Sequence, residues 1–153
     1  MALDIQAMWH QPLELAPSGI GYSLELDKIP DEPGIYVFGR TWGDNLAPLY
    51  IGRSTTLRQR LTTHLNTVKI IQAIRDFPGG NRFILFCTFE LKRGQQIERV
   101  LEVVERGLID KALTEGHELI NVQGTRTPKH TINFQGNRCS EAVSGRQMFV
   151  RET

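Results

Sequence analysis

Five polar side chains stand in or beside apolar segments of this sequence: Tyr36, Tyr50, Arg60, His64 and Glu105. A guanidinium can hold a phosphate with two hydrogen bonds, and a nearby imidazole can donate to the same anion. A carboxylate can bind a hard divalent cation. A phenol is a weak base at pH 7 unless cations lower its pKa. Each residue type is also common for structural reasons, so the elements that position them decide the interpretation.

The segment after Gly52 predicts a helix that ends near residue 65. Its leucines recur every four residues and form one apolar stripe: Leu57, Leu61 and Leu65. Arg60 and His64 are four residues apart along one border of that stripe, at the expected junction of helix and sheet. The alternative for Arg60 is an arginine whose stem packs on the protein while its guanidinium stays in water.

A longer helix is predicted over residues 95–113, where apolar residues recur at helical spacing. Glu105 falls among these apolar positions, whereas most other charges of the segment lie on the opposite side. A carboxylate in a buried stripe is costly unless it is paired or bound to a metal. An ion pair with a core-facing arginine such as Arg60 and a divalent cation are both open at this point.

The remaining periodicity predicts an α+β fold, in which helices flank a small, mostly antiparallel three-stranded sheet in a sandwich-like arrangement. Strands are expected at residues 35–38, 49–51 and 83–89, with a hairpin loop at 39–47 and Gly52 ending the second strand. A further helix is expected at 68–74. The first 31 residues are expected to be irregular, with one short strand at 24–26. Beyond residue 124 the chain is expected to be loop-like, with a short strand at 148–150.

The 153 residues suit one domain, with a core at about 33–122, an N-terminal arm at 1–32 and a basic C-terminal extension at 123–153. No apolar run reaches membrane-spanning length, and no secretory signal is evident, so a cytoplasmic location is expected. Two cysteines make neither a disulfide framework nor a zinc site. Cys87 is expected in the core.

Positive charge is concentrated in two blocks, although the net charge is only +1. Residues 51–75 hold five cations and no carboxylate, and residues 120–153 hold five cations against Glu141 and Glu152. Such blocks can form a patch for a polyanion or can be ordinary solvated surface. Charge alone leaves both interpretations open.

Residues 33–122 resemble the GIY-YIG nuclease superfamily. Its first motif is present as Gly34-Ile35-Tyr36 and its second as Tyr50-Ile51-Gly52. The family has an arginine ten residues after the second tyrosine, and some members have a histidine four residues later. A helical glutamate and an asparagine follow downstream. This chain matches all four at Arg60, His64, Glu105 and Asn121.

Two features depart from the family pattern. The insert between the motifs is slightly longer than usual and affects only a hairpin. Arg53 stands where repair-type members often have lysine, and an arginine can orient a phosphate but hardly act as a base.

The resemblance implies a metal-dependent endonuclease that hydrolyses phosphodiester bonds and leaves a 5′-phosphate, with DNA as the expected substrate. Glu105 would bind one Mg²⁺ or Mn²⁺ ion. Tyr36, with Tyr50 beside it, would activate water, and Asn121 would hold local geometry. Three residues would stabilise the transition state: Arg60, Arg53 and His64. The expected phosphate-binding residues are Arg53, Arg58, Arg126 and Lys129.

Other functions are compatible with the same residues. A catalytically inactive module of this fold could bind nucleic acid or a protein. A nuclease acting on RNA or branched DNA is also open, because contacts to the backbone carry no base information. The N-terminal arm and the basic extension are the expected carriers of substrate choice, and a homodimer would be the simplest way to cut both strands.

Overall fold

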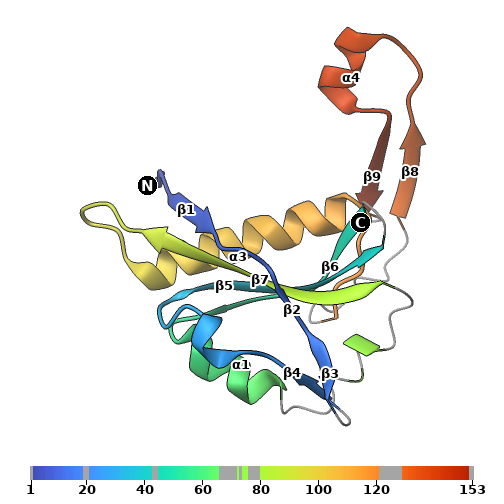
Figure 1. Cartoon of the computed structure of the whole chain (residues 1–153). Helices are drawn as coiled ribbons and strands as arrows, with labels where there is room; N and C mark the ends of the chain where they lie inside the picture. The colour runs from blue at the N-terminus through green and yellow to red at the C-terminus, as the bar shows by residue number, and fades with distance from the viewer. Residues whose placement is uncertain are drawn as a thin grey trace.

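The computed structural model describes residues 2–18, 21–42, 45–65, 72, 74–75, 80–120 and 129–151. Its centre is an antiparallel sheet of the three predicted strands (Figure 1), which are β5 (Gly34–Trp42), β6 (Asn45–Ser54) and β7 (Asn81–Glu90). Strand β5 lies between the other two, and its register with β6 shifts at Phe38/Gly39. The predicted α+β class with an antiparallel central sheet is therefore confirmed, but the predicted count of three strands is wrong, because the sheet has five strands in the described part of the chain.

The two hairpin strands are longer than predicted. Residues 39–42 and 45–47 continue the pairing, so the loop expected at 39–47 is wrong, and β6 runs past Gly52 to Ser54. Thr41 and Trp42 favour extended backbone. Pro48 is tolerated because β6 is an edge strand, where a missing backbone donor need not break the ladder.

The N-terminal segment supplies strands instead of the expected irregular arm. Two strands pair with β7 on the side away from β5: β1 (Gln6–Trp9) and β2 (Leu13–Glu14). A separate pair follows, β3 (Ala16–Ser18) with β4 (Gly21–Ser23). The strand expected at 24–26 is wrong, because the 3-10 helix η1 (Leu26–Lys28) begins there and the strand lies three residues earlier.

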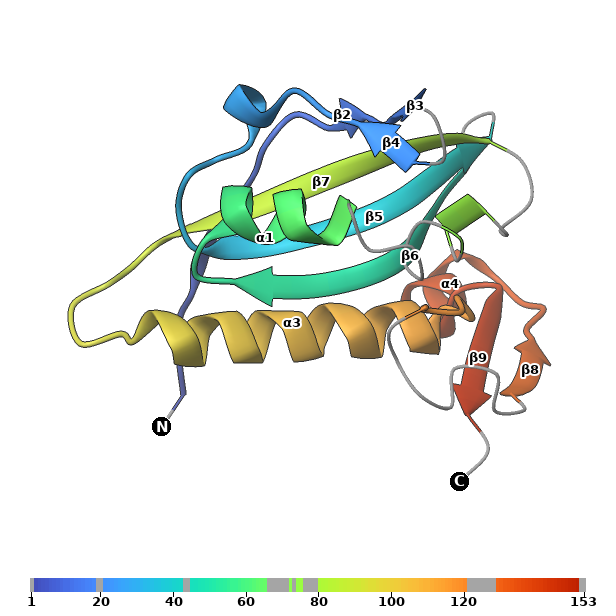
Figure 2. The ribbon, with the colours of Figure 1, turned by 90° about the horizontal axis from the view of Figure 1, so that it is seen from below.

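Two helices cover opposite faces of the sheet, α1 (Leu57–Leu65) and α3 (Ile97–Thr114), as the sequence predicts. The alternation of β5 divides the core between them. Tyr36 and Phe38 pack on the side of α1, whereas Ile35 and Val37 pack on the side of α3. Figure 2 shows the edge strand β6 running between the two helices. This arrangement brings both helices to the same open edge of the sheet.

Several smaller features complete the core. Cys87 is buried as predicted, and Gly116 ends the turn after α3 with a φ of 92°, which favours glycine. Leu119 is buried, and the Ile120 amide donates to the Leu49 carbonyl at 2.7 Å. The helix expected at 68–74 falls mostly outside the described residues. No helix in the described part of the chain is long and apolar enough to span a membrane.

The C-terminal extension contains more regular structure than expected. Strand β8 (Lys129–Asn133) pairs with β9 (Gln147–Arg151), which includes the predicted strand at 148–150. Helix α4 (Arg138–Ser144) connects them and begins with a reciprocal cap between Asn137 and Ser140. Figure 1 shows this unit extending from the C-terminal end of α3, away from the main sheet.

Candidate active site

The two motif tyrosines lie together on the α1 side of the sheet. Their rings stack at 5.9 Å between centroids and 16° between planes. Tyr36 is buried and Tyr50 is half-buried. Tyr36 is the register partner of Gly52 on the edge strand. A Cβ at Gly52 would lie 2.5 Å from Tyr36 Cζ and 2.6 Å from its hydroxyl oxygen. The Tyr36 hydroxyl therefore occupies the space that a side chain at position 52 would need.

Glycine in the first motif serves packing in the same way. A Cβ at Gly34 would lie 2.4 Å from the Cys87 carbonyl oxygen and 2.7 Å from Leu57 Cδ1. Leu57 begins α1, so Gly34 lets that helix approach the sheet closely. Neither contact is visible in the sequence, where the motif spacing is the only signal that marks both glycines.

Arg60 joins the tyrosines through its guanidinium. It hydrogen-bonds to Tyr36 and interacts with Tyr50, although the Arg60 residue as a whole is exposed. Burial raises the pKa of Tyr36 above its ordinary value, and the hydrogen bond from Arg60 works in the opposite direction. Burial prevails, so the Tyr36 phenol is protonated at neutral pH. The structure brings Tyr36, Tyr50 and Arg60 together as a tyrosine–arginine group.

Glu105 faces the same edge strand from the α3 side. Its Oε1 lies 3.6 Å from Nη1 of Arg53, and 23% of its side chain is exposed. The predicted position among apolar residues is therefore partly buried, and the neighbouring cation is Arg53 instead of Arg60. Burial raises the pKa of the Glu105 carboxyl, and the charge of Arg53 lowers it to a smaller extent. We call these two residues the glutamate–arginine pair.

The edge strand separates these two groups. Gly52 and Arg53 are consecutive in β6, so the Arg53 side chain points to one face of the sheet and a Cβ at position 52 would point to the other. Gly52 lies under Tyr36, whereas Arg53 is the register partner of Ile35, which packs toward α3. The tyrosine–arginine group and the glutamate–arginine pair thus flank the open edge of the sheet from its two sides.

The donor set at Glu105 suits a hard divalent cation that takes few protein ligands. Among the described residues, no cluster of three or more histidine, cysteine, aspartate or glutamate side chains could hold a metal. Mg²⁺ is often bound through one or two carboxylates, with water and phosphate oxygens completing its shell. A partly buried carboxylate with a raised pKa gains from such a charge. Glu105 therefore fits a cation of this kind.

The other predicted site residues are only partly covered by the structure. Arg58 donates twice to the Ile29 carbonyl, at 3.2 and 2.8 Å, and pairs with Asp31 at 3.5 Å. These contacts tie α1 to the segment before β5, and a phosphate contact of Arg58 stays a prediction. Four further side chains lie outside the described part of the chain: His64, Asn121, Arg126 and Lys129.

Comparison with known proteins gives two kinds of match and one negative result. No family model matches the chain. Among curated proteins it is similar to excinuclease Cho of Salmonella typhi and of Salmonella typhimurium, each 28% identical over 123 residues. These alignments cover 80% of this chain but 38% of each relative, so the chain spans little more than a third of their length.

Among solved structures, the chain is similar to the GIY-YIG N-terminal endonuclease domain of UvrC from Thermotoga maritima, solved as a point mutant bound to its catalytic divalent cation. The identity is 25%, the match covers 57% of this chain and 83% of that domain, and the TM-score is 0.38.

Proposed function

We propose that the chain is a metal-dependent endonuclease of the GIY-YIG nuclease superfamily, which its motifs resemble. Its substrate would be nucleic acid, with DNA as the proposed form. The observation that carries the proposal is the tyrosine–arginine group above Gly52, opposite the glutamate–arginine pair. The likeness to excinucleases supports a nuclease role.

The residues on the α1 side would bind the scissile phosphate and the attacking water. Arg60 carries a permanent charge and reaches the tyrosines, so it can stabilise the negative charge that develops on the phosphate oxygens. Tyr36, with Tyr50 stacked against it, would orient the water and accept its proton. We assign His64 to the same phosphate and Asn121 to local geometry, from the motif pattern alone.

Tyr36 can act as a base only if positive charge offsets its burial. Its pKa is raised in the free protein, which favours the neutral phenol. The Arg60 guanidinium already lowers that pKa. Neutral Tyr36 would hold the water by hydrogen bonding. Tyr36 would accept the water's proton only as the phenolate, after its own proton has passed to solvent, and the nearby Arg60 guanidinium favours that loss.

The residues on the α3 side would complete the site. Glu105 would hold one divalent ion, Mg²⁺ or Mn²⁺, and Arg53 would orient the phosphate beside it. A divalent cation supplies Lewis-acid stabilisation of a leaving oxygen when bound. Arg53 remains charged at any working pH, so it can position the phosphate but not move a proton.

Cleavage of supercoiled plasmid tests this proposal. Wild-type protein should nick plasmid with Mg²⁺ or Mn²⁺, whereas Glu105→Ala and Arg60→Ala should be at least about 100-fold slower. Arg99→Ala, which removes an exposed cation from α3, should cleave at the wild-type rate. Equal activity in all four proteins would refute the assignment. DNA binding without cleavage in any divalent metal would favour an inactive nucleic-acid-binding module.

A further inference from the structure

A polar pocket of about 260 Å³ lies along the edge strand from the tyrosines. Residues 47–49 of β6 and Arg40 of β5 form one wall, and residues 116–118 after α3 form the other. Leu49 immediately precedes Tyr50, so the pocket continues the edge on which the tyrosine–arginine group lies. None of the motif residues lines it.

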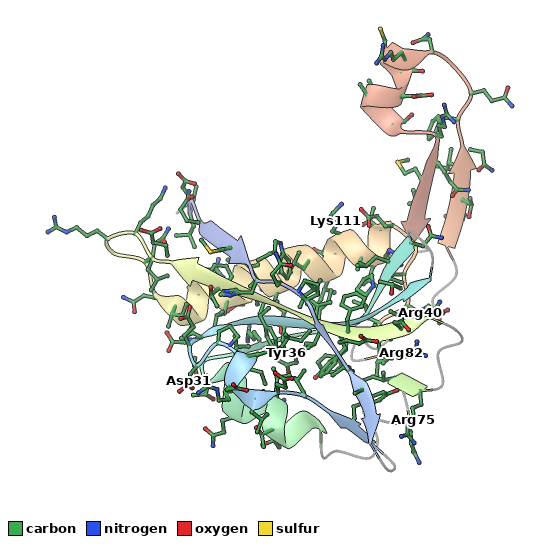
Figure 3. The ribbon with its side chains drawn as sticks, in the orientation of Figure 1. Asp31, Tyr36, Arg40, Arg75, Arg82 and Lys111 are labelled. Carbon is green, nitrogen blue, oxygen red and sulfur yellow. The ribbon has the colours of Figure 1, made fainter. Side chains whose placement is uncertain are left out.

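The sheet register explains why the Arg40 side chain lines this pocket. Arg40 is the register partner of Arg82 on β7, which places two like charges side by side. The Arg82 guanidinium is held by two backbone carbonyls outside the pocket lining, because its Nε donates to the Ile74 carbonyl and its Nη1 to the Gly80 carbonyl, both at 3.1 Å. Repulsion between the two guanidinium groups then favours an Arg40 side chain that turns toward β6. Figure 3 shows Arg40 and Arg82 at the same end of the sheet, with Tyr36 nearer its middle.

The charges around the pocket indicate the ligand. Arg40 and His117 are half-buried and offer hydrogen-bond donors, while Glu118 is exposed at the rim. His117 Nε2 also lies 3.8 Å from an oxygen of Glu115. The negative charges of Glu115 and Glu118 lower the affinity of the pocket for free inorganic phosphate. A nucleotide within a strand suits it better, because its base carries hydrogen-bond donors in addition to the negative charge of its phosphate.

We propose that Arg40 and His117 bind a second phosphate of the substrate strand, separate from the scissile one. This inference rests on the proposed nuclease function. Ala47, opposite Arg40, is three residues from Tyr50, or about 10 Å along an extended strand. A strand of B-form DNA advances about 3.4 Å per nucleotide along the helix axis. The second phosphate therefore lies about three nucleotides from the scissile bond.

The test is a scan of DNA duplexes that each carry one neutral methylphosphonate at a known distance from the mapped cleavage point. For wild type, one substitution about three nucleotides away should weaken binding about tenfold. Arg40→Gln should bind unmodified DNA about tenfold more weakly than wild type, and a methylphosphonate at that position should not weaken its binding further. The slope of log affinity against log salt concentration should be smaller by about 0.9 for this variant. Arg99→Gln, an exposed charge on α3, should retain the wild-type sensitivity.

A second variant guards against misfolding of the first. His117→Gln should also lose its sensitivity to the methylphosphonate about three nucleotides from the cleavage point. If Arg40→Gln does not melt cooperatively, the result for His117→Gln tests the second phosphate site instead. Wild-type sensitivity in both variants, or no sensitive position near three nucleotides in a protein that cleaves DNA, would overturn the second site alone. Failure of wild type to cleave any nucleic acid would instead overturn the proposed function on which it rests.

Discussion

Replacing Gly52 with alanine should disable the proposed chemistry while leaving the fold in place. The added Cβ would lie 2.5 Å from Tyr36 Cζ, whereas ordinary contact begins at 3.4 Å. The ring must therefore withdraw by about 0.9 Å, the difference between these two distances. Tyr36 is buried against Phe38 and Tyr50, so it can move only by disturbing its hydrogen bond to Arg60.

The expected magnitude follows from that displacement. A misplacement of about 1 Å in a catalytic group can cost about 100-fold in rate. The overpacking should lower the free energy of unfolding by about 1–3 kcal/mol, which a stable domain can survive. We therefore expect Gly52→Ala to melt cooperatively and to cleave about 100-fold more slowly than wild type.

The assay is single-turnover plasmid cleavage together with thermal unfolding. Gly107→Ala is the matched control, because a Cβ at this exposed position of α3 meets nothing within 4 Å. It should cleave normally and gain about 0.5–1 kcal/mol of stability. In a Tyr36→Phe background, the Gly52→Ala change should add little further loss. A folded Gly52→Ala protein that cleaves at the wild-type rate would show that the position of the Tyr36 ring over Gly52 does not control the rate.

Three other predictions concern charge. Burial raises the pKa of Glu105, so the folded state holds its proton more tightly, and metal-free wild type loses stability as pH rises from 4.5 through the raised pKa. Glu105→Gln should therefore have a higher melting temperature than wild type at pH 7, and this difference in melting temperature should disappear below pH 4.5. Mg²⁺ should raise the melting temperature of wild type only. A difference in melting temperature that is the same at acid pH and at pH 7 would contradict this. Because burial also raises the pKa of Tyr36, the single-turnover rate should rise with pH from about 6 to 9, and a rate independent of pH would remove Tyr36 as the base. Arg60→Lys should keep the charge but lose the forked geometry, lowering the rate about 10-fold or more, whereas equal rates would show that charge alone suffices.

The periodicity of apolar residues predicted most of the strands and helices that position the site. The continuous apolar run of β7 and the spacing of α3 identified the central strand and the long helix. Helical phase also singled out Glu105 as a charge that is partly buried, which the structure reproduces. These features could be predicted because they depend on residues close together in the chain.

Lateral placement could not be predicted in the same way. Helical phase shows which residues face the sheet but not where the helix lies across it. An ion pair of Glu105 with an arginine such as Arg60 is therefore one of two possibilities that the sequence leaves open, and the structure places Arg53 beside Glu105. The need for glycine at position 52 depends on the register of β5 with β6. All four residues of β1 are exposed, so that strand lacks the apolar alternation that reveals a strand.

We expect the groups on the two sides of β6 to act as one site. Single-turnover cleavage by Arg60→Ala, Glu105→Ala and the double variant tests this expectation most directly. Groups that act together on one phosphate are strongly non-additive, so the double variant should be no slower than the slower single variant. If instead the two losses multiply, the tyrosine–arginine group and Glu105 act independently, and the account of a single active site is contradicted.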